Sequence, residues 1–157
     1  MQNDTSLTLK IYNQRYIYSF KYDVHHSELC KLESRQLFEK EERNNVLFSN
    51  IKIDPSISPF IKNRFEILST AESYAELLKN IEKLHIRIDG FKAEYLISNG
   101  DSTEKHDRNS MLKDIGYRIE GIPNFDNPTV IYSIFNHENI GYFGILTKQN
   151  SDWLNHN

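Results

Sequence analysis

Two strand-like segments near the C-terminal end constrain the fold of this chain most strongly. Residues 129–135 and 140–146 are rich in β-branched, aromatic and other apolar side chains, and only residues 136–139 separate them. Such runs have the composition of β-strands. Because the connection is short, the two strands can pair as an antiparallel hairpin. The sequence therefore predicts a hairpin with its turn around His137-Glu138-Asn139.

Strand-like and helix-like segments alternate before this hairpin. The predicted strands cover residues 16–22, 46–53, 60–68 and 87–98, and the predicted helices cover residues 26–40, 69–84 and 104–115. The resulting order is strand, helix, strand, strand, helix, strand, helix, hairpin. It lacks the regular helical crossovers of a doubly wound sheet. We therefore expect an α+β fold with a mixed or antiparallel sheet.

Local signals add detail to the predicted helices. In the first helix Leu29, Leu32, Gln36 and Leu37 fall roughly on one face, and we expect Cys30 to be a buried or half-buried thiol. Ser69-Thr70-Ala71-Glu72 has the spacing of a capping box, which predicts the start of the second helix. Gly116 suits the left-handed residue that often ends a helix, and so marks the end of the third.

Composition limits the class of protein. The 157 residues suffice for one ordinary domain or two small ones. The net charge of −3 argues against a strongly basic nucleic-acid binder, although a local basic face remains compatible with it. One cysteine rules out an intramolecular disulfide. No apolar run approaches the ~20 residues that cross a bilayer, so we expect a cytoplasmic protein with no membrane partner.

The sequence contains no recognisable catalytic, cofactor or metal motif. It has no Gly-x-Gly-x-x-Gly, no phosphate loop ending in Gly-Lys-Ser/Thr and no Gly-x-Ser-x-Gly elbow. Its six histidines do not combine with cysteines or carboxylates at metal-ligand spacing. We therefore assign no catalytic residue, cofactor site or metal site to this chain.

Basic residues are the remaining candidates for a binding site. One group follows the proline segment at residues 55–59, and a second lies on or just after the third helix. The residues are Lys62, Arg64, Lys105, Arg108, Lys113 and Arg118. Such side chains can neutralise phosphates, but charge alone favours ordinary solvated surface residues. Tyr16, Tyr18 and Tyr22 could stack on bases, and a place in the core or on the sheet is favoured for them.

A series of short motifs runs from about residue 16 to residue 156 in a fixed order. The motifs are residues 16–22 with Leu29 and Glu33, residues 58–68, Ile115-Gly116, Ile119-x-Gly121, Asn127-Pro128, Tyr142-Phe143-Gly144, and Trp153 with His156. In this order they resemble the N-terminal region of tRNA methyltransferases that modify the exocyclic amine of guanosine. In that family a ferredoxin-like unit and an RNA-binding THUMP domain precede the catalytic domain.

The resemblance implies a division of labour. Residues 1–56 would form the ferredoxin-like unit, residues 57–150 the THUMP-like RNA-binding domain, and residues 151–157 the start of a linker to a missing catalytic domain. The chain would bind the acceptor end of tRNA through the six basic residues named above. Its own C-terminal methyltransferase domain would be its other partner and would bind S-adenosylmethionine. Asn127-Pro128-Thr129 lacks the second proline and the aromatic of the family's catalytic motif, so this chain alone is not expected to be an enzyme.

Two other hypotheses remain open. An α+β protein-interaction or ligand-binding domain with no nucleic-acid role is favoured by the acidic balance. A complete small enzyme is the weakest reading, because no catalytic constellation is present.

Overall fold

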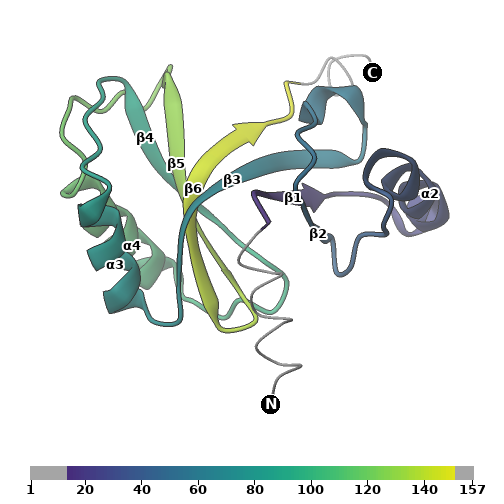
Figure 1. The fold of residues 1–157 in the computed structure, drawn as a ribbon, viewed down its shortest axis with the longest axis horizontal. Coiled ribbons are helices and arrows are strands. Elements are labelled where there is room, and N and C mark those ends of the chain that lie inside the picture. The colour runs from purple at the N-terminus through teal and green to yellow at the C-terminus, as the bar shows by residue number, and fades with distance from the viewer. Residues whose placement is uncertain (1–13, 151–157) are drawn as a thin grey trace. The chain divides into compact units, whose positions relative to one another are not determined.

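The computed structural model describes residues 14–150 (Figure 1). The elements follow the predicted order: β1 (Tyr16–Phe20), η1 (Val24–His26), α2 (Ser27–Phe38), β2 (Val46–Ser49), η2 (Pro55–Ile57), β3 (Ile61–Ala71), α3 (Tyr74–Lys83), β4 (Phe91–Leu96), α4 (Lys105–Gly116), β5 (Val130–His137) and β6 (Ile140–Lys148). The strands form a six-stranded sheet in the order β2-β1-β3-β6-β5-β4. Since β4 and β5 are parallel while β1–β2, β1–β3 and β5–β6 are antiparallel, the predicted α+β fold with a mixed sheet is confirmed.

The chain divides into two compact units. Within residues 14–150, the first consists of residues 14–66 and 147–150, and the second of residues 67–146. The division falls inside β3 and β6, each of which begins in one unit and ends in the other. The sequence predicts two domains, residues 1–56 and 57–150. These limits stay a prediction, because a compact unit is not necessarily a domain that folds independently. The predicted linker at residues 151–157 lies outside the described residues.

The core of the first unit lies between α2 and the strands β1, β2 and β3. Its buried side chains are Tyr16, Tyr18, Phe20, Cys30, Phe38, Leu47 and Ile61. The rings of Tyr18 and Phe38 lie 4.6 Å apart between centroids, and Cys30 is fully buried. The expectations of a buried Cys30 and of Tyr16 and Tyr18 as core residues are therefore confirmed.

The helical face predicted for α2 is wrong in part. Leu29 and Leu32 are 55% and 47% exposed, and the buried residues of α2 are Cys30, Ser34 and Phe38. These three recur every four residues, so they share one side of the helix. Ser34 donates a hydrogen bond of 2.8 Å to the carbonyl oxygen of Cys30, which satisfies its hydroxyl inside the core. The small side chains of Cys30 and Ser34 leave room for the aromatic residues of the sheet. Leucine side chains on this side of the helix would fill that space.

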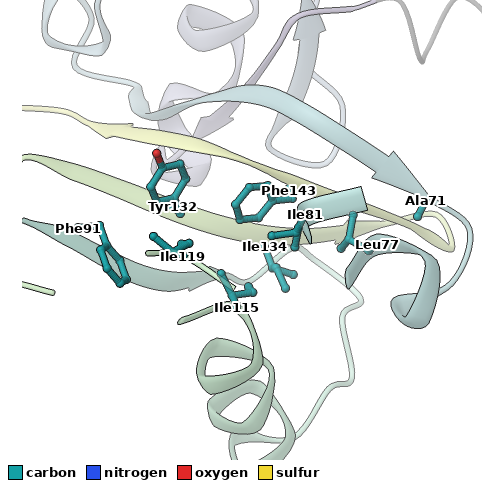
Figure 2. Close-up of a cluster of buried hydrophobic side chains, with 9 residues drawn as sticks. All are labelled: Ala71, Leu77, Ile81, Phe91, Ile115, Ile119, Tyr132, Ile134 and Phe143. Atoms are coloured by element: carbon teal, nitrogen blue, oxygen red, sulfur yellow. The ribbon is translucent and has the colours of Figure 1, made fainter. Parts of the chain in front are cut away.

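In the second unit α3 and α4 pack against one face of the strands. Figure 2 shows the buried cluster: Ala71, Leu77, Ile81, Phe91, Ile115, Ile119, Tyr132, Ile134 and Phe143. The β5–β6 hairpin is confirmed, and its turn residues Glu138 and Asn139 have φ values of 50° and 66°. Two successive residues of positive φ are the mark of a type I′ turn, whose twist matches that of paired strands.

Two predicted helix ends differ from the structure. Strand β3 continues to Ala71, so the predicted cap Ser69 lies in a strand, and Ser73 caps α3 by accepting a 3.2 Å hydrogen bond from the Glu76 N–H. Ser73-x-x-Glu76 has the same spacing as the capping box predicted at Ser69-x-x-Glu72. Gly116 is the last residue of α4, and the residue that caps the helix, Tyr117, has a right-handed rather than a left-handed helical conformation. None of the helices in residues 14–150 is both long and apolar enough to cross a membrane.

Candidate nucleic-acid interface

The predicted basic pair of the first unit has two different environments. Lys62 and Arg64 alternate with the buried Ile61, Asn63 and Phe65 along β3, so both lie on the opposite face of this strand. Lys62 is exposed. Arg64 is half-buried, and its Nη1 donates a 2.9 Å hydrogen bond to the carbonyl oxygen of Ile53. Its guanidinium therefore holds the chain before η2 against β3.

The two predicted arginines of the second unit also make contacts inside the protein. The guanidinium carbon of Arg108 lies 5.8 Å from the centroid of the Tyr95 ring on β4. Arg118 Nη1 donates a 2.8 Å hydrogen bond to the carbonyl oxygen of Asp114, and its Nε lies 3.0 Å from Glu82 Oε1 on α3. These contacts fasten α4 to β4 and to α3, so each arginine has a structural role.

The three predicted lysines are exposed. Lys105 and Lys113 lie on α4, and Lys62 lies on β3 of the other unit. Among residues 14–150 the ion pairs involve other cations, and none of them includes these three lysines. An exposed ammonium group without a carboxylate partner is available to a phosphate.

The geometry of α4 separates an inner from an outer side. Ile115 is fully buried, and Met111 and Leu112 pack beside it. At about 100° per residue, the positions opposite Ile115 are 106, 109, 110, 113 and 117. We call these residues the outer stripe of α4, and they are His106, Asn109, Ser110, Lys113 and Tyr117. All five are exposed, and the stripe contains a cation, hydrogen-bonding groups and an aromatic ring but no carboxylate.

The acidic residues of α4 lie on the flank that faces α3. Asp107 and Asp114 are seven residues apart and therefore share one side of the helix. Asp114 Oδ2 accepts a 2.7 Å hydrogen bond from the Tyr74 hydroxyl of α3. Burial, followed by this hydrogen bond, raises the pKa of the Tyr74 phenol. Asp114 is therefore part of the contact between the two helices, and its charge lies beside the outer stripe rather than on it.

A polar pocket of about 380 Å³ lies where β4 and β5 end. Just beneath it the Tyr95 hydroxyl donates a 2.6 Å hydrogen bond to Asp101 Oδ2 and accepts one of 2.7 Å from Asn136 Nδ2. Burial and then the bond to Asp101 raise the pKa of Tyr95. Burial also opposes ionisation of Asp101, but hydrogen bonds from Tyr95 and Thr103 outweigh it and lower the pKa of this carboxyl.

The pocket is poorly suited to phosphate. Three carboxylates, those of Glu72, Asp101 and Glu138, line it, and its lining residues include no lysine or arginine. Like charges would repel a polyanion entering this space. Within residues 14–150 no cluster of His, Cys, Asp and Glu side chains has the arrangement of a metal site. Of the surfaces of the second unit, the outer stripe of α4 is therefore better matched to RNA.

A second depression lies at the other end of the two helices. It contains Arg87 and Arg118, but each has a glutamate beside it. Arg87 Nη2 lies 2.8 Å from Glu120 Oε2, and Arg118 contacts Glu82 as described above. A phosphate would have to displace a carboxylate from either arginine, so this depression is a weaker candidate.

Tyr117 is an exposed residue of the outer stripe that the sequence analysis did not single out. The predicted helix ends at Gly116, but Gly116 remains helical and Tyr117 follows it with right-handed helical dihedral angles. The signal that could have found it is its position four residues after Lys113, because positions four apart lie on the same helix face.

Comparison with known proteins shows the fold. No family model and no curated protein matches the sequence. Three similar solved structures are a 4-thiouridine synthetase in complex with RNA and bound ATP, PH1313 from Pyrococcus horikoshii Ot3, and TrmN from Thermus thermophilus. Their TM-scores are 0.54, 0.53 and 0.55, at 12%, 12% and 9% identity, and the likeness covers 88%, 88% and 85% of this chain.

The chain spans about half the length of these structures, with 43%, 56% and 46% of them covered. At such low identity the likeness concerns the fold alone. The chain has the α+β fold that these proteins share, which supports the THUMP-like fold implied by the sequence resemblance.

Proposed function

We propose that this chain is an RNA-binding module that docks the acceptor end of tRNA. One of the similar structures is an enzyme in complex with RNA, and this chain corresponds to only part of it. The observation that carries the proposal is that three of the predicted basic residues are exposed and have no carboxylate partner within residues 14–150. Lys62, Lys105 and Lys113 are exposed and outside the ion pairs of the described residues.

Binding of this kind depends on the release of counterions. For single strands the logarithm of the association constant falls by about 0.7 for each phosphate neutralised, per unit of log salt. Three lysines therefore correspond to a slope of about −2. On a chain of net charge −3, this predicts modest affinity that is measurable at low salt and lost as salt rises.

The chemistry is assigned to a further domain. We propose that the full-length parent is a cytoplasmic S-adenosylmethionine-dependent methyltransferase acting on the exocyclic amine of a tRNA guanosine. The cofactor would bind in that further domain, and this chain would hold the RNA by its backbone and its unpaired bases.

The test is a salt titration of tRNA binding, followed by fluorescence anisotropy. Lys105→Ala/Lys113→Ala should weaken binding and reduce the salt slope by about 1.4, which is 0.7 for each lost contact. Lys79→Ala/Lys83→Ala is the matched control, since it removes two exposed lysines from α3 and makes the same change in net charge. Equal losses in both variants would show that only overall charge matters. A wild-type chain that binds no tRNA even at low salt would contradict the proposal.

One observation favours the alternative of a ligand-binding or protein-interaction domain. It is the carboxylate-lined pocket at the ends of β4 and β5, which suits a cationic or hydrogen-bonding partner better than RNA. This alternative predicts the absence of tRNA binding at every salt concentration, so the same titration separates the two functions.

A further inference from the structure

We infer that the outer stripe of α4 is a track for single-stranded RNA, on which Tyr117 stacks against one unpaired base and Lys113 contacts the neighbouring phosphate. The inference deepens the proposed function and rests on it. It names a residue, Tyr117, and a form of RNA, the unpaired strand, that the basic residues alone do not specify.

The first observation is the exposure of Tyr117. Its side chain is 84% exposed, the highest value among the exposed large hydrophobic residues of the described chain. Two residues later Ile119 is 5% exposed and belongs to the core, so the chain turns inward directly after the ring. A tyrosine in this position adds almost nothing to the packing of the fold. It has the flat, open face on which a base of any identity can stack.

The second observation is the alignment of Tyr117 with the helix. Tyr117 has φ −67° and ψ −19°, so the helical turn continues through it. His106, Ser110, Lys113 and Tyr117 then fall within a sector of about 60° on a line about 16 Å long, at 100° and 1.5 Å per residue. Lys113 and Tyr117 are one turn apart, so a charged group and an aromatic face are presented together.

The third observation is the distribution of charge around this line. The carboxylates of Asp107 and Asp114 lie on the flank toward α3, and Asp114 is engaged by Tyr74. Lys105 lies on the opposite flank and is exposed. A strand that follows the outer stripe therefore meets ammonium, imidazole, amide and hydroxyl groups. A lysine beside an aromatic platform is the pairing of groups on which single-strand binding depends.

An exposed aromatic elsewhere in the unit has no lysine or arginine near it in the sequence. Phe125 is 67% exposed, but the residues around it, from 120 to 126, include Glu120 and Asp126 and no lysine or arginine. Phe125 therefore has no lysine one helical turn away, as Tyr117 has in Lys113. It serves as the matched control for the loss of an exposed aromatic surface.

The experiment measures binding of two fluorescein-labelled probes at low salt. One is a single-stranded RNA with the sequence of a tRNA acceptor end, and the other is the same strand in a blunt duplex. Tyr117→Ala should weaken binding of the single strand by about fivefold to a hundredfold, the usual effect of removing one stacking side chain. It should change duplex binding less than about twofold, because paired bases are not available for stacking. Tyr117→Phe and Phe125→Ala should both bind the single strand as the wild type does.

A second readout reports stacking itself. A 2-aminopurine in the single strand should be quenched by the wild type and by Tyr117→Phe, and not by Tyr117→Ala. Tyr117→Ala that binds the single strand like the wild type would overturn the inference while leaving the RNA-binding function intact. Equal losses for Tyr117→Ala and Phe125→Ala would also overturn it. Failure of the wild type to bind either probe would instead contradict the proposed function.

Discussion

Arg64 Nη1 donates a hydrogen bond of 2.9 Å to the carbonyl oxygen of Ile53. Its guanidinium carbon lies 5.9 Å from the centroid of the Tyr16 ring, and Nη2 lies 3.4 Å from Thr147 Oγ1 on β6. One side chain thus connects β1, β3, β6 and the chain before η2. The neighbouring Lys62 on the same strand face is exposed and has no such role.

The different contacts of Arg64 and Lys62 predict that their substitution has different effects on stability. Arg64→Ala should lower the free energy of unfolding by about 1–2 kcal/mol, because the partly buried Ile53 carbonyl loses its donor. Lys62→Ala should change it by less than about 0.5 kcal/mol and should weaken tRNA binding. Urea denaturation followed by circular dichroism measures the first effect, and anisotropy measures the second. Equal stability of the two variants would argue against a structural role for Arg64.

Gly121 is required by the close approach of two chain segments. It has φ 143°, and an added Cβ would lie 1.8 Å from the carbonyl oxygen of Ile88. Its neighbours hold the two segments together, since Ile88 N–H donates to the Glu120 carbonyl at 2.8 Å and Gly90 N–H to the Ile122 carbonyl at 2.7 Å. Gly121→Ala should therefore destabilise the chain by about 3 kcal/mol, through steric clash and backbone strain.

Gly116 is the matched control for Gly121. No atom lies within 4 Å of a Cβ added at Gly116, and this residue is helical. Gly116→Ala should stabilise the chain by about 0.5–1 kcal/mol, because alanine loses less conformational entropy in a helix. The melting temperatures of the two variants should therefore move in opposite directions. A fall for both would mean that Gly116 has a constraint that its surroundings do not reveal.

The start of α3 can be tested with two serines, Ser69 and Ser73, each of which lies three residues before a glutamate. Ser73→Ala should cost about 1 kcal/mol in the free energy of unfolding, because the Glu76 N–H loses the oxygen that caps it. Ser69→Ala removes a hydroxyl from within β3 and should cost less than about 0.5 kcal/mol. Urea denaturation of the two variants measures the difference. A larger loss of stability for Ser69→Ala than for Ser73→Ala would support the capping box predicted from the sequence.

The fold should weaken in alkali through Tyr22. Its hydroxyl donates a 3.0 Å hydrogen bond to Glu42 Oε1. Burial, followed by this bond to a carboxylate, raises the pKa of the Tyr22 phenol to about 12. Because the pKa is higher in the folded than in the unfolded chain, the protonated phenol stabilises the fold. This contribution is complete below pH 10 and is lost as the pH rises from 10 to 12.

Unfolding by urea at pH 8, 10 and 11 tests this dependence on Tyr22. Tyr22→Phe should reduce the loss of stability between pH 10 and 11. Cys30 adds a loss that begins about one pH unit lower, because burial and then the charge of Glu42 raise the pKa of its thiol to about 12 from the lower ordinary value of a thiol. A wild-type stability that does not fall between pH 10 and 11 would rule out this contribution.

Local patterns in the sequence were sufficient for the order of the elements. Alternating apolar residues identify β3, and the stripe of Leu77, Leu78 and Ile81 identifies α3, since each pattern is a property of a single segment. The hairpin of β5 and β6 was also predictable, because its strands are neighbours along the chain. The helix start at Ser69 was predicted wrongly because Ser73-x-x-Glu76 offers a capping box of the same spacing four residues later.

Contacts between distant segments required the tertiary structure. The parallel pairing of β4 with β5 depends on a crossover through α4, and no local pattern specifies it. The burial of Cys30 and Ser34 in place of Leu29 and Leu32 depends on the shape of the aromatic side chains beneath α2. Side-chain fit across an interface is set by both partners, and the helix sequence contains only one of them.

The sequence by itself determined the residue types of the candidate interface, and the tertiary structure decided which of them are available. The six basic residues look equivalent along the chain, and Tyr117 looks like part of a loop. In the folded chain Arg64, Arg108 and Arg118 contact Ile53, Tyr95 and Glu82, while the lysines and Tyr117 remain exposed. The physical reason is that a guanidinium offers several directed donors to partners far away in sequence. Only folding brings those partners within reach.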